Sequence, residues 1–260
     1  MREAVTARGT VADLAERLDD AMRNATAIAQ IDQPLSLEQA YAVQAAAFAR
    51  RLGRGERRIG IKMGFTSLAK MAQMGISEVI WGRLSDAMLV ENGGSISRAR
   101  YVHPRTEPEI AFRLGADLGG SVTAEEALAA VSGIAPALEI IDSRYENFKF
   151  SLTDVVADNS SSSGLVVGNW LSPETDIAAV AMRLEVDGQV REEGTSAAIL
   201  GNPILSLVEA ARLAAAAGEP LRAGEIIMAG GATAAVALAV GAQVRLVAGA
   251  LGEVQFRVAA

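Results

Sequence analysis

The first part of the chain carries apolar side chains at the spacing of three or four that is typical of helices. One apolar stripe follows Thr10, a favourable helix cap, and is formed by Val11, Leu14, Leu18 and Met22. Ser36 and Gln39 have the spacing of a capping box, which predicts a second helix that ends at Gly53. We therefore expect the chain to begin with two amphipathic helices.

The pattern then changes to the two-residue alternation of strands. Within residues 59–65, large apolar side chains alternate with Gly60, Lys62 and Gly64, which predicts a strand. A short helix from Ser67 to Met74 is predicted to follow it. Beyond about residue 100, further segments show strand patterns, and they lie at residues 108–114, 164–168, 180–186, 221–228, 244–247 and 254–258.

Turn and cap residues separate these strands. Asp187-Gly188 has the composition of a hairpin turn. Two helices are predicted within the sheet-rich part, one beginning at Thr123 and one beginning at Asn202 with Pro203 in its first position. We expect an α+β protein with a helical N-terminal domain over residues 1–90. A sheet-rich domain over residues 91–260 would follow.

Composition narrows the class of protein. The chain has 260 residues, half of them hydrophobic, and a formal net charge of −7. Nucleic acids and anionic membranes attract basic surfaces, so neither is an expected partner. The absence of cysteine excludes disulfides, thiolate catalysis and iron–sulfur clusters. Residues 226–244 are uncharged but rich in Ala and Gly, which favours a strand–loop–strand segment over a membrane helix. Residues 1–23 lack a signal-peptide pattern. We therefore expect a cytoplasmic protein.

Three glutamates are candidate metal ligands. Glu107 and Glu109 are two apart on a predicted strand, so both side chains leave the same face. Glu139 lies inside an apolar run, where a lone carboxylate is costly to bury. Mg²⁺ or Mn²⁺ would account for all three carboxylates. The alternative is a solvated strand face with Glu139 in a salt bridge, and spacing alone leaves both interpretations open. The candidate ion-pair partners would then be Arg105, Arg113 and Arg144.

Other polar residues are candidates for binding an anionic substrate. Lys62 lies between two glycines, where it could reach a substrate carboxylate or enolate, although a lysine on an edge strand would fit equally. Asp142 follows Glu139 closely. Residues 158–163 form a hydroxyl-rich loop, expected between two apolar strands, that could bind a carboxylate or could be a flexible surface loop. His103 is the only histidine, and no G-x-S-x-G motif accompanies it, so we expect it to be structural.

Several segments, in order from about residue 35 to the C-terminus, resemble the hydratase/decarboxylase branch of the fumarylacetoacetate hydrolase superfamily. They include Gly60-Ile-Lys-Met-Gly-Phe-Thr-Ser67, Pro108-Glu-Ile-Ala-Phe112, Leu138-Glu-Ile-Ile-Asp-Ser-Arg144 and Asp154-Val-Val-Ala-Asp-Asn159. The resemblance implies a sheet-rich C-terminal domain of mixed sandwich or roll form, with Glu107, Glu109 and Glu139 as metal ligands. It also implies active-site roles for Lys62, Asp142 and Ser161. Hydrolytic relatives use a histidine ahead of the metal site, and this chain has none there.

The branch contains two activities, and the resemblance favours one. One activity is the decarboxylation of 2-oxohex-3-enedioate, and the other is the hydration of 2-hydroxypenta-2,4-dienoate. Four segments favour the decarboxylation, and they are Met63-Gly64-Phe65, residues 81–84, residues 102–105 and residues 229–234. This reaction belongs to the meta-cleavage route of catechol degradation, and its product is the substrate of the hydratase. A complex with that hydratase and a homo-oligomeric state are therefore expected. The departing carboxylate should face an apolar wall, and Trp81 and Arg83 are candidates to contact it. Sister hydratase activity and a non-catalytic partner with a degenerate site remain the alternatives.

Overall fold

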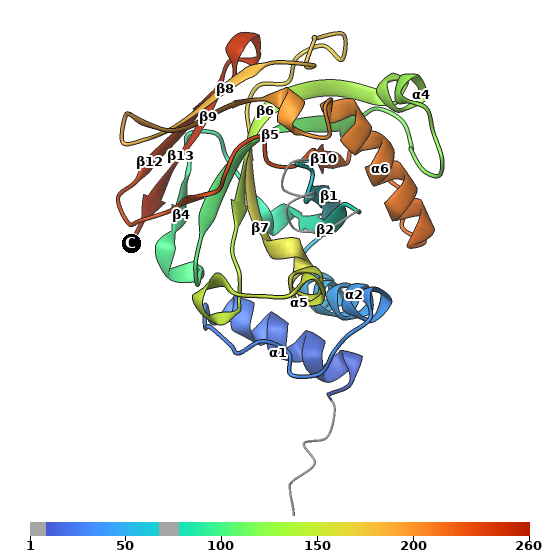
Figure 1. Cartoon of the computed structure of the whole chain (residues 1–260), viewed down its shortest axis with the longest axis vertical. Helices are drawn as coiled ribbons and strands as arrows, with labels where there is room; N and C mark the ends of the chain where they lie inside the picture. The colour runs from blue at the N-terminus through green and yellow to red at the C-terminus, as the bar shows by residue number, and fades with distance from the viewer. Residues whose placement is uncertain (1–8, 68–77) are drawn as a thin grey trace, which may run out of the picture.

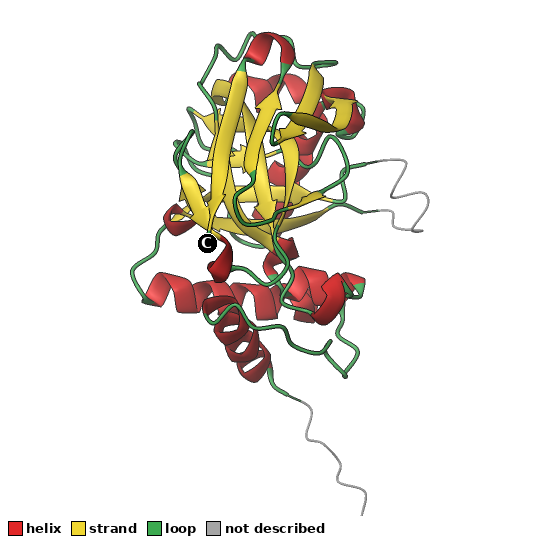
Figure 2. Cartoon of the chain, turned by 90° about the vertical axis from the view of Figure 1, so that its left-hand side faces the viewer, coloured by secondary structure: helices red, strands yellow, loops and turns green. Residues whose placement is uncertain are grey.

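The computed structural model describes residues 9–67 and 78–260. The chain begins with α1 (Val11–Arg23) and α2 (Leu37–Gly53). Both helices open with complete capping boxes, which confirms the predicted cap at Thr10 and the predicted box at Ser36. Together with α5 (Leu152–Ala157) they form a layer beneath the strands, which Figures 1 and 2 show from two sides. The helix predicted from Ser67 to Met74 falls outside the described residues apart from Ser67.

Within the described part of the chain, a mixed sheet of eight strands carries the glutamates. Its order is β2-β1-β10-β5-β6-β7-β3, and β11 pairs with β5. The strands in chain order are β1 (Arg58–Gly64), β2 (Ile80–Ser85), β3 (Leu89–Val90), β5 (Arg105–Leu114), β6 (Val131–Ile141), β7 (Ser162–Val167), β10 (Ile226–Met228) and β11 (Val236–Ala237). Long antiparallel pairing of β5 with β6 forms its centre.

A second sheet, of five strands, packs against the first. Its order is β4-β13-β12-β8-β9. These strands are β4 (Ser95–Ser97), β8 (Ala181–Val186), β9 (Gln189–Thr195), β12 (Gln243–Val247) and β13 (Glu253–Ala259). The main hydrophobic core lies between the sheets and includes Phe112, Leu138 and Phe256, all almost fully buried. Helices α6 (Pro203–Ala216) and α4 (Ala124–Ala129) pack together on the outside, with α6 against β1 (Figure 1).

Local signals predicted most of these elements correctly. The β8–β9 hairpin turns at Asp187 and Gly188, and both have the positive φ that such turns require. Helices α4 and α6 begin after the predicted caps, Thr123 and Asn202. Residues 226–244 form short strands joined by loops, as expected. Among the described helices, none has the length and apolarity needed to cross a bilayer.

Two local predictions were wrong, and one remains a prediction. The strand expected over residues 221–228 begins only at Ile226, because Gly224 adopts a positive φ in a turn before it. Residues 158–163 connect helix α5 to strand β7 rather than two strands, and most of them are buried. The apolar run of residues 155–157 belongs to that helix, and a run so short does not reveal its periodicity. The division into domains at residue 90 stays a prediction. Strands β1 and β2, which precede that point, pair within the large sheet.

Candidate active site

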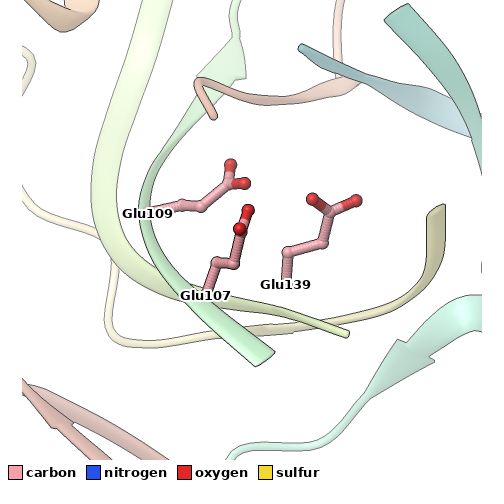
Figure 3. Close-up of side chains that lie close together, drawn as sticks. All are labelled: Glu107, Glu109 and Glu139. Carbon is pink, nitrogen blue, oxygen red and sulfur yellow. The ribbon is translucent and has the colours of Figure 1, made fainter. Parts of the chain in front are cut away.

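The three glutamates converge on one face of the β5–β6 pair. The antiparallel register places Glu107 directly opposite Glu139, and Glu109 follows two residues along β5 on the same face. One carboxylate oxygen from each residue lies within 4.8 Å of those from the other two (Figure 3). Glu109 and Glu139 are buried, and Glu107 is half-buried. A solvated strand face is therefore the wrong description of this cluster.

Each buried glutamate has one engaged oxygen and one open oxygen. The backbone N–H of Gly230 donates to Glu109 Oε2 at 2.7 Å. Lys62 Nζ donates to Glu139 Oε2 at 3.2 Å. The remaining oxygens, Glu109 Oε1 and Glu139 Oε1, are buried without a hydrogen-bond partner among the described residues. Buried carboxylate oxygens are costly to leave unsatisfied, so the donor set fits a divalent cation, which prefers oxygen ligands.

The pKa of Glu109 also indicates that its carboxylate would be stabilised by a nearby cation. Burial raises the pKa of Glu109 well above its ordinary value, and the negative charge of Glu139 raises it further. The Lys62 ammonium and the Gly230 N–H act in the opposite direction but do not outweigh burial. A cation between the carboxylates would favour their ionised forms.

Lys62 is held inside the sheet. Its strand, β1, is flanked by β2 and β10, and its side chain is buried, so the edge-strand alternative was wrong. The ion pair with Glu139 shows that the salt bridge considered for that glutamate exists, with lysine rather than arginine. Among the arginines considered, Arg144 pairs with Asp158 and Arg113 lies over the ring of Trp170.

Close backbone approach at the cluster explains the Gly230-Gly231 pair. Gly230 has a φ of +106°, in the region that favours glycine, and its N–H positions Glu109. A Cβ atom added to Gly231 would lie 2.5 Å from Glu107 Oε2. No larger residue fits at Gly231 without moving the carboxylate of Glu107.

A cavity of about 370 Å³ opens beside the cluster. Its polar lining includes Lys62, Glu107, Arg105 and Ser161. The apolar part of its wall includes Phe65, Ile80, Ile141, Phe148, Phe150 and Val155. Enclosure of a few convergent polar groups by apolar side chains is typical of small-molecule sites.

The segment that carries Ser161 has a strained backbone. Asn159, Ser160 and Ser161 have φ values of 52°, 51° and 61°, which non-glycine residues rarely adopt. Ser160 Oγ donates to the carbonyl of Trp81, and Asn159 Oδ1 accepts from the N–H of Arg83. These bonds hold the segment, and Ser161 Oγ is left buried with no partner in the described structure. Strain of this kind concentrates at functional sites.

Asp142 has a different environment. Its side chain is buried, and its two oxygens accept backbone N–H groups from Val102 and His103 at 2.9 and 2.5 Å. Its own N–H donates to the carbonyl of Ser161. Asp142 therefore ties the segment before β5 to the segment that carries Ser161, and it does not line the cavity.

The structure corrects the two residues considered for the distal carboxylate. Trp81 and Arg83 flank Gly82, the residue that pairs with Lys62, so their side chains leave the opposite face of β2. Trp81 stacks on Tyr41, and Arg83 forms an ion pair with Glu219. Sequence reasoning gave Arg105 no place in the cavity, although its two-residue spacing from Glu107 could have indicated it.

Comparisons with known proteins agree with this geometry. Residues 59–259 match the model of the family described as fumarylacetoacetate (FAA) hydrolase C-terminal, and the chain belongs to this family. It is 56% identical to a 4-oxalocrotonate decarboxylase of a Pseudomonas species, over 95% of this chain and 97% of the relative. A 2-hydroxyhexa-2,4-dienoate hydratase of Comamonas testosteroni is 35% identical over 91% of this chain and 93% of the relative.

A solved structure extends the similarity to the fold. The 4-oxalocrotonate decarboxylase from Pseudomonas putida G7, complexed with magnesium and adipate, matches with a TM-score of 0.92 and 39% identity. The match covers 95% of this chain and 97% of that one. The expected fold class, an α+β protein of fumarylacetoacetate hydrolase type, is confirmed.

Proposed function

We propose that this protein is a metal-dependent carboxy-lyase. It converts 4-oxalocrotonate, which is 2-oxohex-3-enedioate, to 2-hydroxypenta-2,4-dienoate and CO₂. The observation that carries the proposal is the glutamate cluster beside an enclosed cavity, in which Glu109 and Glu139 each retain an open buried oxygen. Identity to the decarboxylases among its relatives, at 40% to 56%, exceeds identity to the hydratases, at 35% to 38%. Hydratase activity therefore remains the second candidate.

Mg²⁺ is the proposed cofactor, with Mn²⁺ as the alternative. Glu107, Glu109 and Glu139 would hold it, because they present oxygen ligands from two strands that pair in register. When bound, the ion supplies Lewis-acid stabilisation to a 2-keto acid at the point where negative charge grows. Ca²⁺ accompanies acetate in another structure of the Pseudomonas putida G7 enzyme, so oxygen-preferring cations occupy that relative.

The reaction needs an electron sink and a proton. Breaking the bond between C5 and C6 releases CO₂ and moves its electron pair through the conjugated double bond to the C2 oxygen. A proton must then reach that oxygen to form the 2-hydroxy product. The Lys62 ammonium, held by Glu139, supplies positive charge near the developing dienolate. The Ser161 hydroxyl, without a described partner, can donate a hydrogen bond to an oxygen of the substrate.

We assign Asp142 a positioning role. Through Val102, His103 and Ser161 it joins the segment that leads into β5 to the segment that carries Ser161, so its loss should displace Ser161. Apolar side chains in the cavity wall lower the local dielectric constant, which strengthens the electrostatic contribution of Lys62. These contacts support the proposed catalytic roles of Lys62 and Ser161 and the proposed positioning role of Asp142.

The partners follow from the chemistry. The substrate is a small 2-keto dicarboxylate from the meta-cleavage of catechols. The product is unstable as an enol, so a physical complex with the hydratase that consumes it would favour its capture. Assembly with this hydratase, a homo-oligomeric state and a cytoplasmic location remain proposals.

A direct comparison of substrates tests the assignment. The protein, supplied with Mg²⁺ and both 2-oxohex-3-enedioate and 2-hydroxypenta-2,4-dienoate, should consume the first and accumulate the second. Consumption of the dienoate alone would identify a hydratase instead. A protein that binds no Mg²⁺ and consumes neither compound would support a non-catalytic partner.

A further inference from the structure

Arg105 places a positive charge in the lining of the cavity. It lies on β5 two residues before Glu107, on the same face, and it lines the cavity. Its guanidinium lies 4.3 Å from the ring centroid of Phe148. No hydrogen-bond or ion-pair partner of its side chain occurs among the described residues, whereas the buried Arg83 and Arg144 each pair with a carboxylate.

This arrangement suits a planar anion. A guanidinium presents a rigid fork of donors that matches a carboxylate bidentately. The cation–π contact with Phe148 holds the guanidinium in place without using its N–H donors. Lys62 also lines the cavity, but its ammonium is already paired with Glu139. The guanidinium of Arg105 is therefore available to bind an anionic ligand.

The distance between Arg105 and Glu107 along β5 is similar to the length of the proposed substrate. Strand residues rise by about 3.3 Å each, so the backbone of Arg105 lies about 6.6 Å from that of Glu107. The end carbons of an extended six-carbon diacid are separated by about 6 Å, given carbon–carbon bonds of about 1.5 Å. A substrate with its keto-acid end at the glutamates is therefore long enough for its second carboxylate to reach Arg105.

We propose that Arg105 binds the distal carboxylate of the substrate and selects dicarboxylates over monocarboxylates. The inference rests on the proposed function and deepens it. The expected wall of purely apolar groups around the departing carboxylate is replaced by apolar side chains with one arginine. Because the departing group becomes neutral CO₂, its pairing with Arg105 weakens toward the transition state. Arg105 therefore contributes affinity and selectivity rather than rate.

Two 2-keto acids isolate this contact. 2-Oxoadipate and 2-oxohexanoate share the keto-acid end and differ only in the distal carboxylate, and neither has the double bond that decarboxylation requires. Calorimetry on the Mg²⁺-loaded protein should show that 2-oxoadipate binds about 10- to 100-fold more tightly, the range expected for a charge-assisted hydrogen bond. Arg105→Met should remove this preference by weakening 2-oxoadipate alone, and Arg105→Lys should retain part of it.

Arg113 provides the matched control. It lies on the same strand and stacks over Trp170 at 4.9 Å, but it does not line the cavity. Arg113→Met should keep the full preference. Equal weakening of both keto acids by Arg105→Met, or no preference in the unmodified protein, would overturn the proposal.

Turnover supplies a second readout. With 2-oxohex-3-enedioate, Arg105→Met should raise KM by about 10- to 100-fold while kcat stays equal or rises. A fall in kcat at unchanged KM would contradict the assignment. If the unmodified protein prefers 2-oxoadipate yet leaves 2-oxohex-3-enedioate intact, the proposed reaction fails and the selectivity of Arg105 stands.

Discussion

Lys62 Nζ lies 3.2 Å from Glu139 Oε2, although β10 and β5 separate their two strands in the sheet order. Neighbouring strands are about 4.8 Å apart, so in a flat sheet the backbones of β1 and β6 would lie about 14 Å apart. The sheet therefore curves, and its curvature together with the length of both side chains brings the ammonium to the carboxylate. The same concave face collects the three glutamates and the cavity.

Replacing Glu109 with Gln should abolish metal-dependent turnover without unfolding the protein. The amide keeps the shape of the side chain and removes the charge that burial already disfavours. Mg²⁺ binding by calorimetry should be lost, while the metal-free Tm is unchanged or higher. Glu193→Gln, at an exposed position on β9, is the control and should behave like the unmodified protein. Full activity of Glu109→Gln after exhaustive chelation would falsify the metal assignment.

The stabilisation by Mg²⁺ should grow with pH. The folded-state pKa of Glu109 is raised, so its contribution to stability is full at low pH and is lost as pH rises through that pKa. Mg²⁺ requires the ionised carboxylates, so it opposes this loss. At about 100 times its Kd it should add about 2.7 kcal/mol to the free energy of unfolding. Thermal unfolding with and without Mg²⁺ across a pH series measures this difference, and a Tm gain independent of pH would contradict the account.

Gly231→Ala should weaken Mg²⁺ binding by about 10-fold or more, as other changes near metal ligands do. The added Cβ would lie 2.5 Å from Glu107 Oε2, so that carboxylate must move. The side chain of Glu107 can rotate, so the fold should persist and far-ultraviolet circular dichroism should be unchanged. Gly53→Ala is a suitable control, because its Cβ meets nothing within 4 Å. Unaltered Mg²⁺ affinity in Gly231→Ala would argue against Glu107 as a ligand.

Lys62→Met should lower kcat by about 100-fold or more, the loss typical of removing an electrostatic group at a developing oxyanion. The removal also leaves Glu139 without its ion-pair partner, so metal affinity must be measured alongside turnover. Lys62 could instead act as a Schiff-base nucleophile. Borohydride added during turnover, followed by mass spectrometry, should detect no adduct on the chain. A covalent adduct on Lys62 would replace the electrostatic role with an imine mechanism.

Elements with strong local signals were predictable from the sequence. The helices after Thr10, Ser36, Thr123 and Asn202 begin where side-chain caps satisfy the first backbone N–H groups. Glu107 and Glu109 share a face because strand side chains alternate. Their meeting with Glu139 depends on the β5–β6 register, which spacing along the chain does not determine.

The register of β1 with β2 also explains why Trp81 and Arg83 were wrongly expected to contact the substrate. A shift of one residue exchanges the two faces of a strand, and so Trp81 and Arg83 leave the sheet opposite to Lys62. The place of Arg105 in the cavity depends on Phe148, which adopts a φ of 57° after β6, a conformation that the sequence does not signal. The roles of Lys62, Asp142 and Ser161 stay predictions until their variants are measured.

The most direct measurement of the central claim follows the ultraviolet absorbance of 2-oxohex-3-enedioate with the purified protein. With Mg²⁺, we expect rapid loss of the substrate, release of CO₂ and transient formation of 2-hydroxypenta-2,4-dienoate. Exhaustive chelation should stop the reaction, and renewed Mg²⁺ should restore it. No change in absorbance with or without Mg²⁺, or an equal rate after chelation, would contradict metal-dependent decarboxylation at the three glutamates.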